Sequence, residues 1–498
     1  MNGQESDDFV VVGGRESRPQ GEGNHKSAQS KEEKRIGDWD LLGGNPKSEQ
    51  EGVSPTKRSS TQLLEIAKKA KEEPKKKFTG LYRLLNEAFL MECWQEMNKN
   101  SASGIDGMSP KQFGENLEEE VSRIVQALKS KSYRAPKIRR KMIPKGDGKF
   151  RPLGIPTIGD KLVQKGVSKI LESIYEQDFL DSSYGYRKGI QIHEAIQEIN
   201  NSVVKEGFRW VLEADIKGFF ENLDHEWMRR MLQERVADES LIRLIGKWMK
   251  VGIVEEGGKE IHPEAGTPQG GIISPILANL YLHYVLDLWF EKRMKRRLQG
   301  RARLFRYADD FIVLFEEEQD ARNFKMALEE RLHSFGLDLA EDKTRIVELQ
   351  KNKGKGEFDF LGFTFRWGKS RKGYATLKRE TARSRLRKAV DRFNEWCRNS
   401  RSFGNNEIIE RVKRMFLGHR NYYGLRGNSR QVNTYFYLCR RILYRWINRR
   451  SQKRSMNWSE FNRWIKNNKL NEIKAIKPEK RETLGELFER LSSEASRT

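Results

Sequence analysis

Three aspartates have the residue type and placement to act together in catalysis: Asp215, and the adjacent pair Asp309 and Asp310. Two carboxylates a few ångströms apart repel each other, so a buried pair is costly unless a cation neutralises it. Three hard oxygen donors suit Mg²⁺, which keeps some of its waters and binds substrate phosphates. Two such ions about 4 Å apart would catalyse in-line phosphoryl transfer by stabilising the attacking and leaving oxygens. An Asp-Asp pair alone is more often a solvated turn, so the rest of the sequence is needed to choose between the two.

Strand-like segments would position all three carboxylates. The apolar runs Leu304–Tyr307 and Phe311–Phe315 flank the Asp pair, and this pattern predicts a β-hairpin with the pair at its tip. Trp210–Phe220 begins as another strand, with Asp215 near its end. We therefore expect an α+β region that brings strand ends and carboxylates together.

A basic hairpin is predicted over Lys141–Pro156, where Lys-Gly-Asp-Gly-Lys is a turn signal between two strand-like runs. Lys145, Lys149 and Arg151 around its tip could hold phosphates, because such cations pair with phosphate oxygens. Alone, the segment would be interpreted as an exposed basic turn. Together with the three aspartates it indicates a nucleotide polymerase that positions a triphosphate.

Positive charge is concentrated near the C-terminal end. The sequence has a net charge of +24, and residues 371–498 carry +21 of it. From Thr381 the pattern is almost purely helical, which predicts a bundle with a basic surface. Eight Trp, Tyr and Phe residues between Phe416 and Trp446 make nucleic acid a better partner than a membrane. The cysteines form no CxxC motif, so neither zinc nor a disulfide framework is expected: Cys93, Cys397 and Cys439.

The N-terminal residues 1–75 are rich in Gly, Ser, Glu, Lys and Gln, which predicts a disordered extension ending in a helix within Ser59–Lys77, up to Pro74. No apolar run approaches the ~18 residues of a membrane span, and the acidic N-terminus is unlike a signal peptide. We therefore expect a cytoplasmic protein.

Nine motifs, in order, resemble those of the reverse transcriptases encoded by bacterial and organellar group II introns. The resemblance as a whole covers about Phe78 to Phe461. The nine motifs are FTGLYRLLNEAFL, GIDG, IPKGDGKFRPLGIPT, YGYRKG, LEADIKGFFENLDH, GTPQGGIISPILANLYLH, FRYADDFIVL, GLDLAEDKTRIV and FDFLGFTF. The resemblance implies a right-hand polymerase, with fingers and a palm (an antiparallel sheet packed on helices) followed by an α-helical thumb or maturase bundle. The domains expected are a low-complexity extension (1–75), N-terminal helices and fingers (76–205), a palm with partly interleaved fingers elements (206–370), a thumb or maturase X domain (371–465) and a basic tail (466–498).

The resemblance also implies residue roles. Asp215 and Asp309 would be the main ligands of two Mg²⁺ ions, for which Mn²⁺ could substitute, with Asp310 as the third acidic residue and the Ile216 carbonyl as a further ligand. Phe219 would be the steric gate that excludes a 2′-hydroxyl, although core packing is the interpretation without the motif. Further nucleotide contacts are expected at Lys145, Arg151, Gln269 and Lys343.

The thumb is matched by Tyr422-Tyr423-Gly424 and by Trp446–Phe461. The partners implied are template or intron RNA, a DNA primer or target, and dNTPs, in a bacterial-type nucleoprotein. Trp446, Trp458 and Phe461 are expected in the core rather than as base-stacking platforms. Contacts to primer, template or RNA are expected at Tyr307, Ala308, Gly362, Arg449, Arg450, Lys453 and Arg454, although the last four could also be a solvated helix end.

The leading interpretation is thus an RNA-directed DNA polymerase that assists splicing and mobility of its host intron. No Cys/His endonuclease pattern follows Phe461, so no endonuclease domain is predicted. Two alternatives stay open: a free-standing, intron-derived reverse transcriptase with a host role in DNA repair or phage defence, and an RNA-binding maturase with a dead polymerase, against which the intact aspartates argue.

Overall fold

The chain folds into two compact units, each built from two stretches of sequence. The computed structural model describes residues 55–146, 149–255, 257–261, 265–267, 270–351, 354–370, 372–449, 456–473 and 475, without the side chains of 55–60 and 144–149. The first unit comprises Met1–Leu180 with Gly218–Glu291, and the second comprises Asp181–Lys217 with Lys292–Thr498. The five domains expected from the sequence remain predictions.

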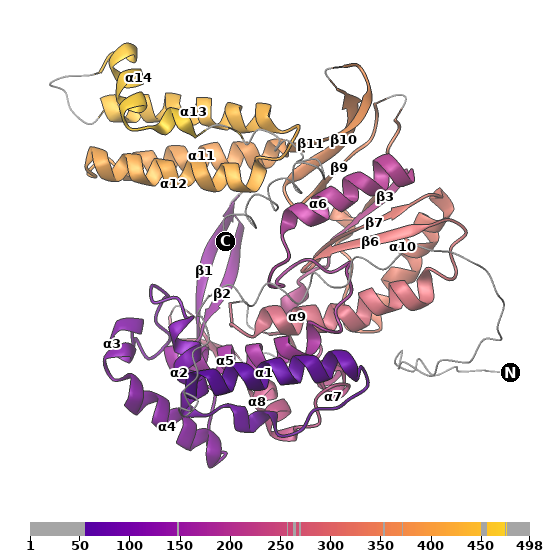
Figure 1. Cartoon of the computed structure of the whole chain (residues 1–498), viewed down its shortest axis with the longest axis vertical. Helices are drawn as coiled ribbons and strands as arrows, with labels where there is room; N and C mark the ends of the chain where they lie inside the picture. Colours follow the sequence, from indigo (N-terminus) through magenta and orange to yellow (C-terminus); the bar gives the residue numbers. More distant parts are fainter. Residues whose placement is uncertain are drawn as a thin grey trace, which may run out of the picture. The chain divides into compact units, whose positions relative to one another are not determined.

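Helices make up most of the first unit (Figure 1): α1 (Pro55–Glu72), α2 (Glu87–Gln95), α3 (Pro110–Glu115), α4 (Leu117–Lys129), α5 (Ile158–Tyr175), α7 (His225–Gln233), α8 (Glu239–Met249) and α9 (Ser274–Leu282). Shorter helical turns are η3 (Leu81–Leu84), η5 (Phe219–Glu221) and η6 (His283–Asp287). A sheet of order β2-β1-β4-β5 contains β1 (Ile138–Gly146), β2 (Lys149–Ile155), β4 (Ile253–Val254) and β5 (Glu260–Ile261). The β1–β2 pair is the predicted basic hairpin.

Helix α5 is largely buried and carries a buried carboxyl group. Asp160 accepts hydrogen bonds from Tyr133 Oη (2.6 Å), Gln164 Nε2 (2.9 Å) and Trp248 Nε1 (2.7 Å). These bonds satisfy a side chain that would otherwise be costly to bury. They also tie α5 to α8, the helix that contains Trp248.

Helix α1 falls within the extension 1–75 that was expected to be disordered, and it agrees with the helix predicted within Ser59–Lys77. It packs against α5 and α2. Ala70 is buried, and Arg235 donates to the carbonyls of Ala70 (3.1 Å) and Pro74 (2.7 Å). The last third of the expected extension is therefore part of the first unit, while residues 1–54 lie outside the described residues.

The second unit contains two antiparallel sheets and a helical region. The first sheet, of order β6-β7-β3-β8, is formed by β3 (Trp210–Ala214), β6 (Ala302–Tyr307), β7 (Asp310–Phe315) and β8 (Arg345–Glu348). The second, of order β11-β10-β9, is formed by β9 (Glu357–Phe360), β10 (Phe363–Lys369) and β11 (Ala375–Thr381). The helices are α6 (Ile192–Asn201), α10 (Glu318–His333), α11 (Arg383–Asn399), α12 (Asn405–Tyr423), α13 (Ser429–Asn448) and α14 (Trp458–Asn467), with short turns η4 (Ser202–Glu206), η8 (Glu341–Lys343) and η9 (Leu470–Glu472).

Both faces of the four-stranded sheet are covered, which explains the continuous apolar run in β7. Every residue of β7 after Asp310 is buried. On one face α10 packs against β3 and β7, with Phe324 and Phe315 rings 5.5 Å apart. On the other face, Val211 and Ile312 join a core formed with α6 and the second sheet. A strand that is buried on both faces has a continuous run of apolar residues, rather than apolar residues that alternate with polar ones.

The helical region forms a bundle, as its sequence periodicity predicted. Helices α11, α12 and α13 lie side by side (Figure 1), and their core includes Phe393, Val412, Phe416 and Cys439. Phe461 of α14 is fully buried in the same core. The fold is therefore of the mixed α+β class with a C-terminal helical region. No described helix combines the length and apolar character needed to span a membrane.

Candidate active site

The candidate site is built around the tight turn between β6 and β7. Tyr307 and Asp310 form the last pair of the hairpin, leaving Ala308 and Asp309 as the two turn residues. Ala308 has a positive φ of 59°, as two-residue hairpin turns require. Ala308 is buried, whereas Asp310 is the one residue of β7 that is not, so the turn presents its carboxylates at the sheet end.

The register of β3 against β7 brings the third aspartate to this turn. Ala214 pairs with Phe311, which places the next residue, Asp215, beside Asp310 at the end of the ladder. Beyond β3, Ile216 forms a single bridge with Leu339. The hydrogen bonds of this bridge are made by Lys217 N–H to Asp338 O (2.8 Å) and Ala340 N–H to Asp215 O (2.8 Å), so the bridge does not use the Ile216 carbonyl. That carbonyl is thus compatible with its predicted role as a ligand.

Burial and the negative charges of the clustered carboxylates raise the pKa of Asp310. The pKa of Asp310 is raised to about 6, first because the surrounding protein removes hydration from its carboxyl group, and then by the negative charges of Asp309 and Asp215. Arg385 and Lys343 oppose this effect and lower the pKa of Asp310. The three predicted aspartates are therefore close enough to repel each other, which is the condition that a bound cation relieves.

Lys343 supplies a positive charge to the same site. Its ammonium group pairs with the Asp215 carboxylate, and this contact raises the pKa of Lys343. Lys343 is the last residue of η8, which the Ala340–Asp215 hydrogen bond fixes beside the end of β3. The sequence had predicted Lys343 as a phosphate contact, whereas the structure shows it paired with a predicted metal ligand.

The residues of the turn fit a magnesium site in their chemistry. Within the described ranges, no three His, Cys, Asp or Glu side chains are grouped as a ready-made metal site. Asp215, Asp309 and Asp310 nevertheless offer the hard oxygen donors that Mg²⁺ prefers. The raised pKa of Asp310 shows that uncompensated negative charge is present where cations would bind. Asp215 would have to exchange Lys343 for a metal ion.

A buried arginine holds the backbone of the β6–β7 turn through hydrogen bonds. Arg306 is fully buried in β6 and donates through Nη1 to the Ala308 carbonyl (3.1 Å) and through Nη2 to Ser183 Oγ (2.7 Å). It therefore fixes the backbone of the turn residue that precedes Asp309. Sequence reasoning assigned no role to Arg306, although an arginine inside an apolar strand is an unusual feature.

A second turn, after β9, belongs to the same unit. Leu361 and Gly362 both have positive φ (52° and 79°), and Tyr422 Oη donates to the Leu361 carbonyl (3.0 Å). A Cβ on Gly362 would lie 2.9 Å from Tyr423 Oη and 3.7 Å from Arg385 Cγ. The predicted primer-side residue Gly362 is therefore required for the close approach of α12. Arg385, which sequence reasoning missed, thus lies next to this turn, and its charge lowers the pKa of Asp310.

Comparison with known proteins identifies the family to which this site belongs. Residues 143–365 match the reverse transcriptase (RNA-dependent DNA polymerase) family. The chain is also 30% identical over 460 residues to the group II intron-encoded protein LtrA of Lactococcus lactis subsp. cremoris, a match that covers 76% of this chain and 75% of that protein. The chain belongs to the group II intron-encoded reverse transcriptases. It is an RNA-dependent DNA polymerase, as its motifs indicated.

Other relatives of this reverse transcriptase are similar over shorter spans. Protein YkfC of Escherichia coli (strain K12) is 31% identical over 318 residues, which is 56% of this chain and 81% of that protein. A 91 kDa protein in the cob intron of Schizosaccharomyces pombe is 33% identical over 243 residues, covering 48% and 30% respectively.

Some predicted nucleotide contacts of the reverse transcriptase lie in the first unit. Phe219 is buried, with its ring 5.3 Å from Phe220 and 6.4 Å from Tyr281, so it packs as a core residue there. Arg151 is exposed on β2, opposite Ile143. Lys145 lies on β1 but its side chain is not described, and Gln269 lies outside the described residues.

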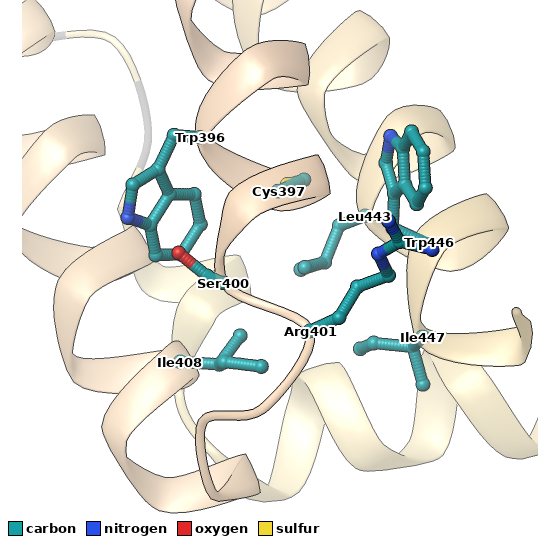
Figure 2. A pocket seen from close by; sticks show the side chains of 8 residues that line it. All are labelled: Trp396, Cys397, Ser400, Arg401, Ile408, Leu443, Trp446 and Ile447. Carbon is teal, nitrogen blue, oxygen red and sulfur yellow. The ribbon is translucent and has the colours of Figure 1, made fainter. Parts of the chain in front are cut away.

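The C-terminal helical bundle contains a small hollow that Trp446 helps to line. Arg401 extends toward the Trp446 ring (Figure 2), with its guanidinium 5.4 Å from the ring centroid, and Arg449 lies 5.6 Å away. Trp446 Nε1 also donates to Asn394 Oδ1 (2.8 Å). Trp446 is thus held by contacts within the bundle, as expected for a packing residue. Trp458 is 44% exposed, unlike the buried Phe461, so the expected core position is wrong for Trp458. The hollow is lined by Trp396, Cys397, Ser400, Arg401, Ile408, Leu443, Trp446 and Ile447.

Of the four arginines and lysines predicted to contact RNA after α13, one lies within the described residues. Arg449 is exposed just after α13, while Arg450, Lys453 and Arg454 lie outside the described residues. The RNA-binding role of this segment therefore remains a prediction.

Proposed function

We propose that this reverse transcriptase has a right-hand polymerase architecture, synthesises DNA by two-metal phosphoryl transfer, and binds its own group II intron RNA to assist splicing and mobility. The main support for the polymerase part is the register of β3 and β7. Through this register, Asp215 meets Asp310 of the same sheet end although 95 residues separate them in sequence. The raised pKa of Asp310 is consistent with a cluster that takes up cations.

The three aspartates and the Ile216 carbonyl would hold the two Mg²⁺ ions, or Mn²⁺ in their place. When bound, the ions would favour ionisation of the primer 3′-hydroxyl and stabilise charge on the phosphate oxygens. Arg306 keeps the turn rigid by holding the Ala308 carbonyl. Lys343, once displaced from Asp215, is placed to attract a triphosphate or primer phosphate.

The remaining nucleotide contacts follow from the family resemblance. Lys145 and Arg151 would hold the triphosphate, Gln269 would shape the nucleotide pocket, and Phe219 would exclude the 2′-hydroxyl. Tyr307, Ala308 and Gly362 would contact the primer end. These assignments agree with the exposed position of Arg151 on β2 and with the small side chain of Ala308 at the turn.

The maturase role is supported by the relatives and by charge. The Lactococcus protein is named as encoded by a group II intron, and its match covers three quarters of each chain. The segment 371–498 carries +21 of the net charge of +24, enough to contact many phosphates. We propose that this segment, including Arg449, Arg450, Lys453 and Arg454, binds intron RNA and the template–primer duplex.

Primer extension on an RNA template tests the polymerase site. Wild-type protein should extend a DNA primer with dNTPs and Mg²⁺, whereas Asp309→Ala should not. Equal synthesis by both proteins would overturn the site assignment. Asp342→Ala, beside Lys343 but outside the carboxylate cluster, is the matched control and should keep most activity.

Splicing of the intron RNA that flanks the gene tests the maturase role. Purified protein should accelerate splicing at Mg²⁺ concentrations at which the RNA alone splices slowly, and Asp309→Ala should do so equally well. No acceleration, or the absence of intron sequence around the reading frame, would instead favour a free-standing reverse transcriptase.

A further inference from the structure

The loop Tyr184–Arg187 is docked onto the catalytic turn. Tyr184 N–H donates to the Arg306 carbonyl (2.8 Å), and Arg306 N–H donates to the Ser182 carbonyl (2.8 Å). A Cβ added to Gly185 would lie only 2.4 Å from the Ala308 backbone nitrogen, so only glycine allows this approach. The loop therefore lies directly against the residue that precedes Asp309.

Two arginines fix this loop in place. Arg306 donates to Ser183 Oγ (2.7 Å) while also holding the Ala308 carbonyl, and Arg187 Nη1 donates to the Ser183 carbonyl (2.7 Å). Loop and turn are thus connected through the same buried guanidinium. A residue on the loop will keep a constant position relative to the catalytic turn.

Tyr186, which follows Gly185, combines two features that a purely structural residue would avoid. Its φ is +60°, in the left-handed region that disfavours bulky side chains. The residue is also 53% exposed, so its ring is accessible to a ligand. Backbone strain of this kind concentrates at functional sites. Ala308 and Leu361, on the two turns beside the carboxylates, share the positive φ.

We propose that Tyr186 is a stacking contact for a nucleobase of the template–primer at the catalytic turn. A tyrosine ring offers a flat apolar face to any base, so the contact would be independent of sequence. Tyr186 directly follows Gly185, which contacts Ala308, so its ring must lie near the turn that carries Asp309 and Asp310. The proposal rests on the proposed assignment of these aspartates as the catalytic centre.

The deciding variant is Tyr186→Gly, because glycine adopts a positive φ without strain. We expect the thermal stability of this variant to equal or exceed that of the wild type. Its KM for an RNA template with a DNA primer should rise about 5- to 150-fold, the range that loss of one base–aromatic stack gives. Tyr186→Phe keeps the ring and should stay within about twofold of the wild type by the same reasoning.

A matched control is Tyr374→Ala. Tyr374 is 72% exposed in the turn before β11 and has no role in the proposed site, so its variant should keep wild-type kinetics. An unchanged KM for Tyr186→Gly would overturn the proposal. A loss of thermal stability together with activity in Tyr186→Gly would also overturn it, because the residue would then be structural.

Fluorescence of 2-aminopurine locates the base. The probe is placed either at the templating position or at the primer 3′ end. At one of these two positions, the wild-type protein should quench the fluorescence of the probe more strongly than Tyr186→Gly does. Equal quenching by both proteins at both positions would contradict stacking. Asp309→Ala is measured alongside: if it still synthesises DNA, the proposed catalytic centre fails, whatever Tyr186 does.

Discussion

The ammonium group of Lys343 pairs with the carboxylate of Asp215 across 128 positions of sequence. Lys343 ends η8, and the Ala340 N–H bond to the Asp215 carbonyl holds that turn against the end of β3. One carboxylate of the candidate site is therefore neutralised by the protein itself. A divalent cation must compete with this lysine for Asp215.

Replacing Lys343 by methionine should separate metal binding from nucleotide binding. Without the competing ammonium, the Mg²⁺ concentration for half-maximal synthesis should fall about fivefold, corresponding to the ~1 kcal/mol of an exposed ion pair. The KM for dNTP should rise, because a phosphate-binding cation is lost. Steady-state primer extension over a Mg²⁺ series measures both, with Lys369→Met, an exposed residue at the end of β10, as control. Unchanged values of both quantities would remove Lys343 from the site.

Replacing Asp310 by asparagine should make the protein more stable and less active. The folded state raises the pKa of Asp310 from 3.8 to about 6, so the ionised carboxylate destabilises the fold above about pH 6, and this effect disappears as pH falls toward 4. Asp310→Asn should therefore raise Tm in metal-free buffer at about pH 7.5 and raise it less at about pH 5. Primer extension by the same variant should fall by a factor of about 100 or more, as for loss of a preorganised electrostatic group. A lowered Tm in metal-free buffer would contradict the electrostatic repulsion described above.

His419 should make the stability of the C-terminal helical bundle sensitive to acid. Burial lowers the pKa of His419 from 6.5 to about 4, and its ring stacks on Tyr435 with centroids 3.7 Å apart. Because the folded pKa lies below the unfolded one, the unfolded chain binds more protons between about pH 6.5 and 4, and stability falls as pH decreases through that range. At about pH 5 this single group costs about 2 kcal/mol of unfolding free energy. Denaturant titrations of wild type and His419→Phe at about pH 7.5 and 5 should show that the variant loses less stability on acidification; parallel losses would refute this role.

RNA binding by the basic segment 371–498 should depend steeply on salt. A protein that neutralises many phosphates releases their counterions, so its affinity should fall about 100-fold or more between ~50 and ~200 mM monovalent salt. Filter binding or anisotropy with intron RNA measures the slope of log Kd against log salt. Arg449→Gln should reduce that slope by about one, while Glu460→Gln, an acidic residue on α14, should not reduce it. A flat response would contradict the proposed RNA surface.

Phe219 should be tested through the ratio of substrates rather than total activity, because it is also a core residue. Phe219→Val should raise kcat/KM for rNTPs relative to dNTPs, since a smaller side chain leaves room for a 2′-hydroxyl. The lost packing should also lower the free energy of unfolding by about 1–3 kcal/mol. Met228→Leu, another buried substitution in the first unit, is the control for indirect effects on selectivity. If the ratio of kcat/KM for rNTPs to that for dNTPs did not change, Phe219 would have only a packing role.

The local elements and the three aspartates were predictable, and their connections were not. Apolar runs on both sides of Asp309 and Asp310 predicted the hairpin, and helical periodicity predicted the bundle. The register of Ala214 with Phe311 depends on packing against both faces of the sheet, which no single segment encodes. The same holds for the Lys343–Asp215 pair and for the contact of Gly185 with Ala308, because each joins residues more than 100 positions apart.

The central place of β3 in its sheet has a consequence for biosynthesis. Its two neighbours, β7 and β8, are made roughly 100 and 130 residues later, after the whole of Gly218–Glu291 has been translated. Until then the nascent chain exposes an apolar strand, Trp210–Ala214, with both hydrogen-bonding edges open, a state prone to aggregation. Translation has to pass Glu348 before the sheet can close. A ribosome stalled before that point would carry a chain that has all three aspartates but no completed four-stranded sheet around them.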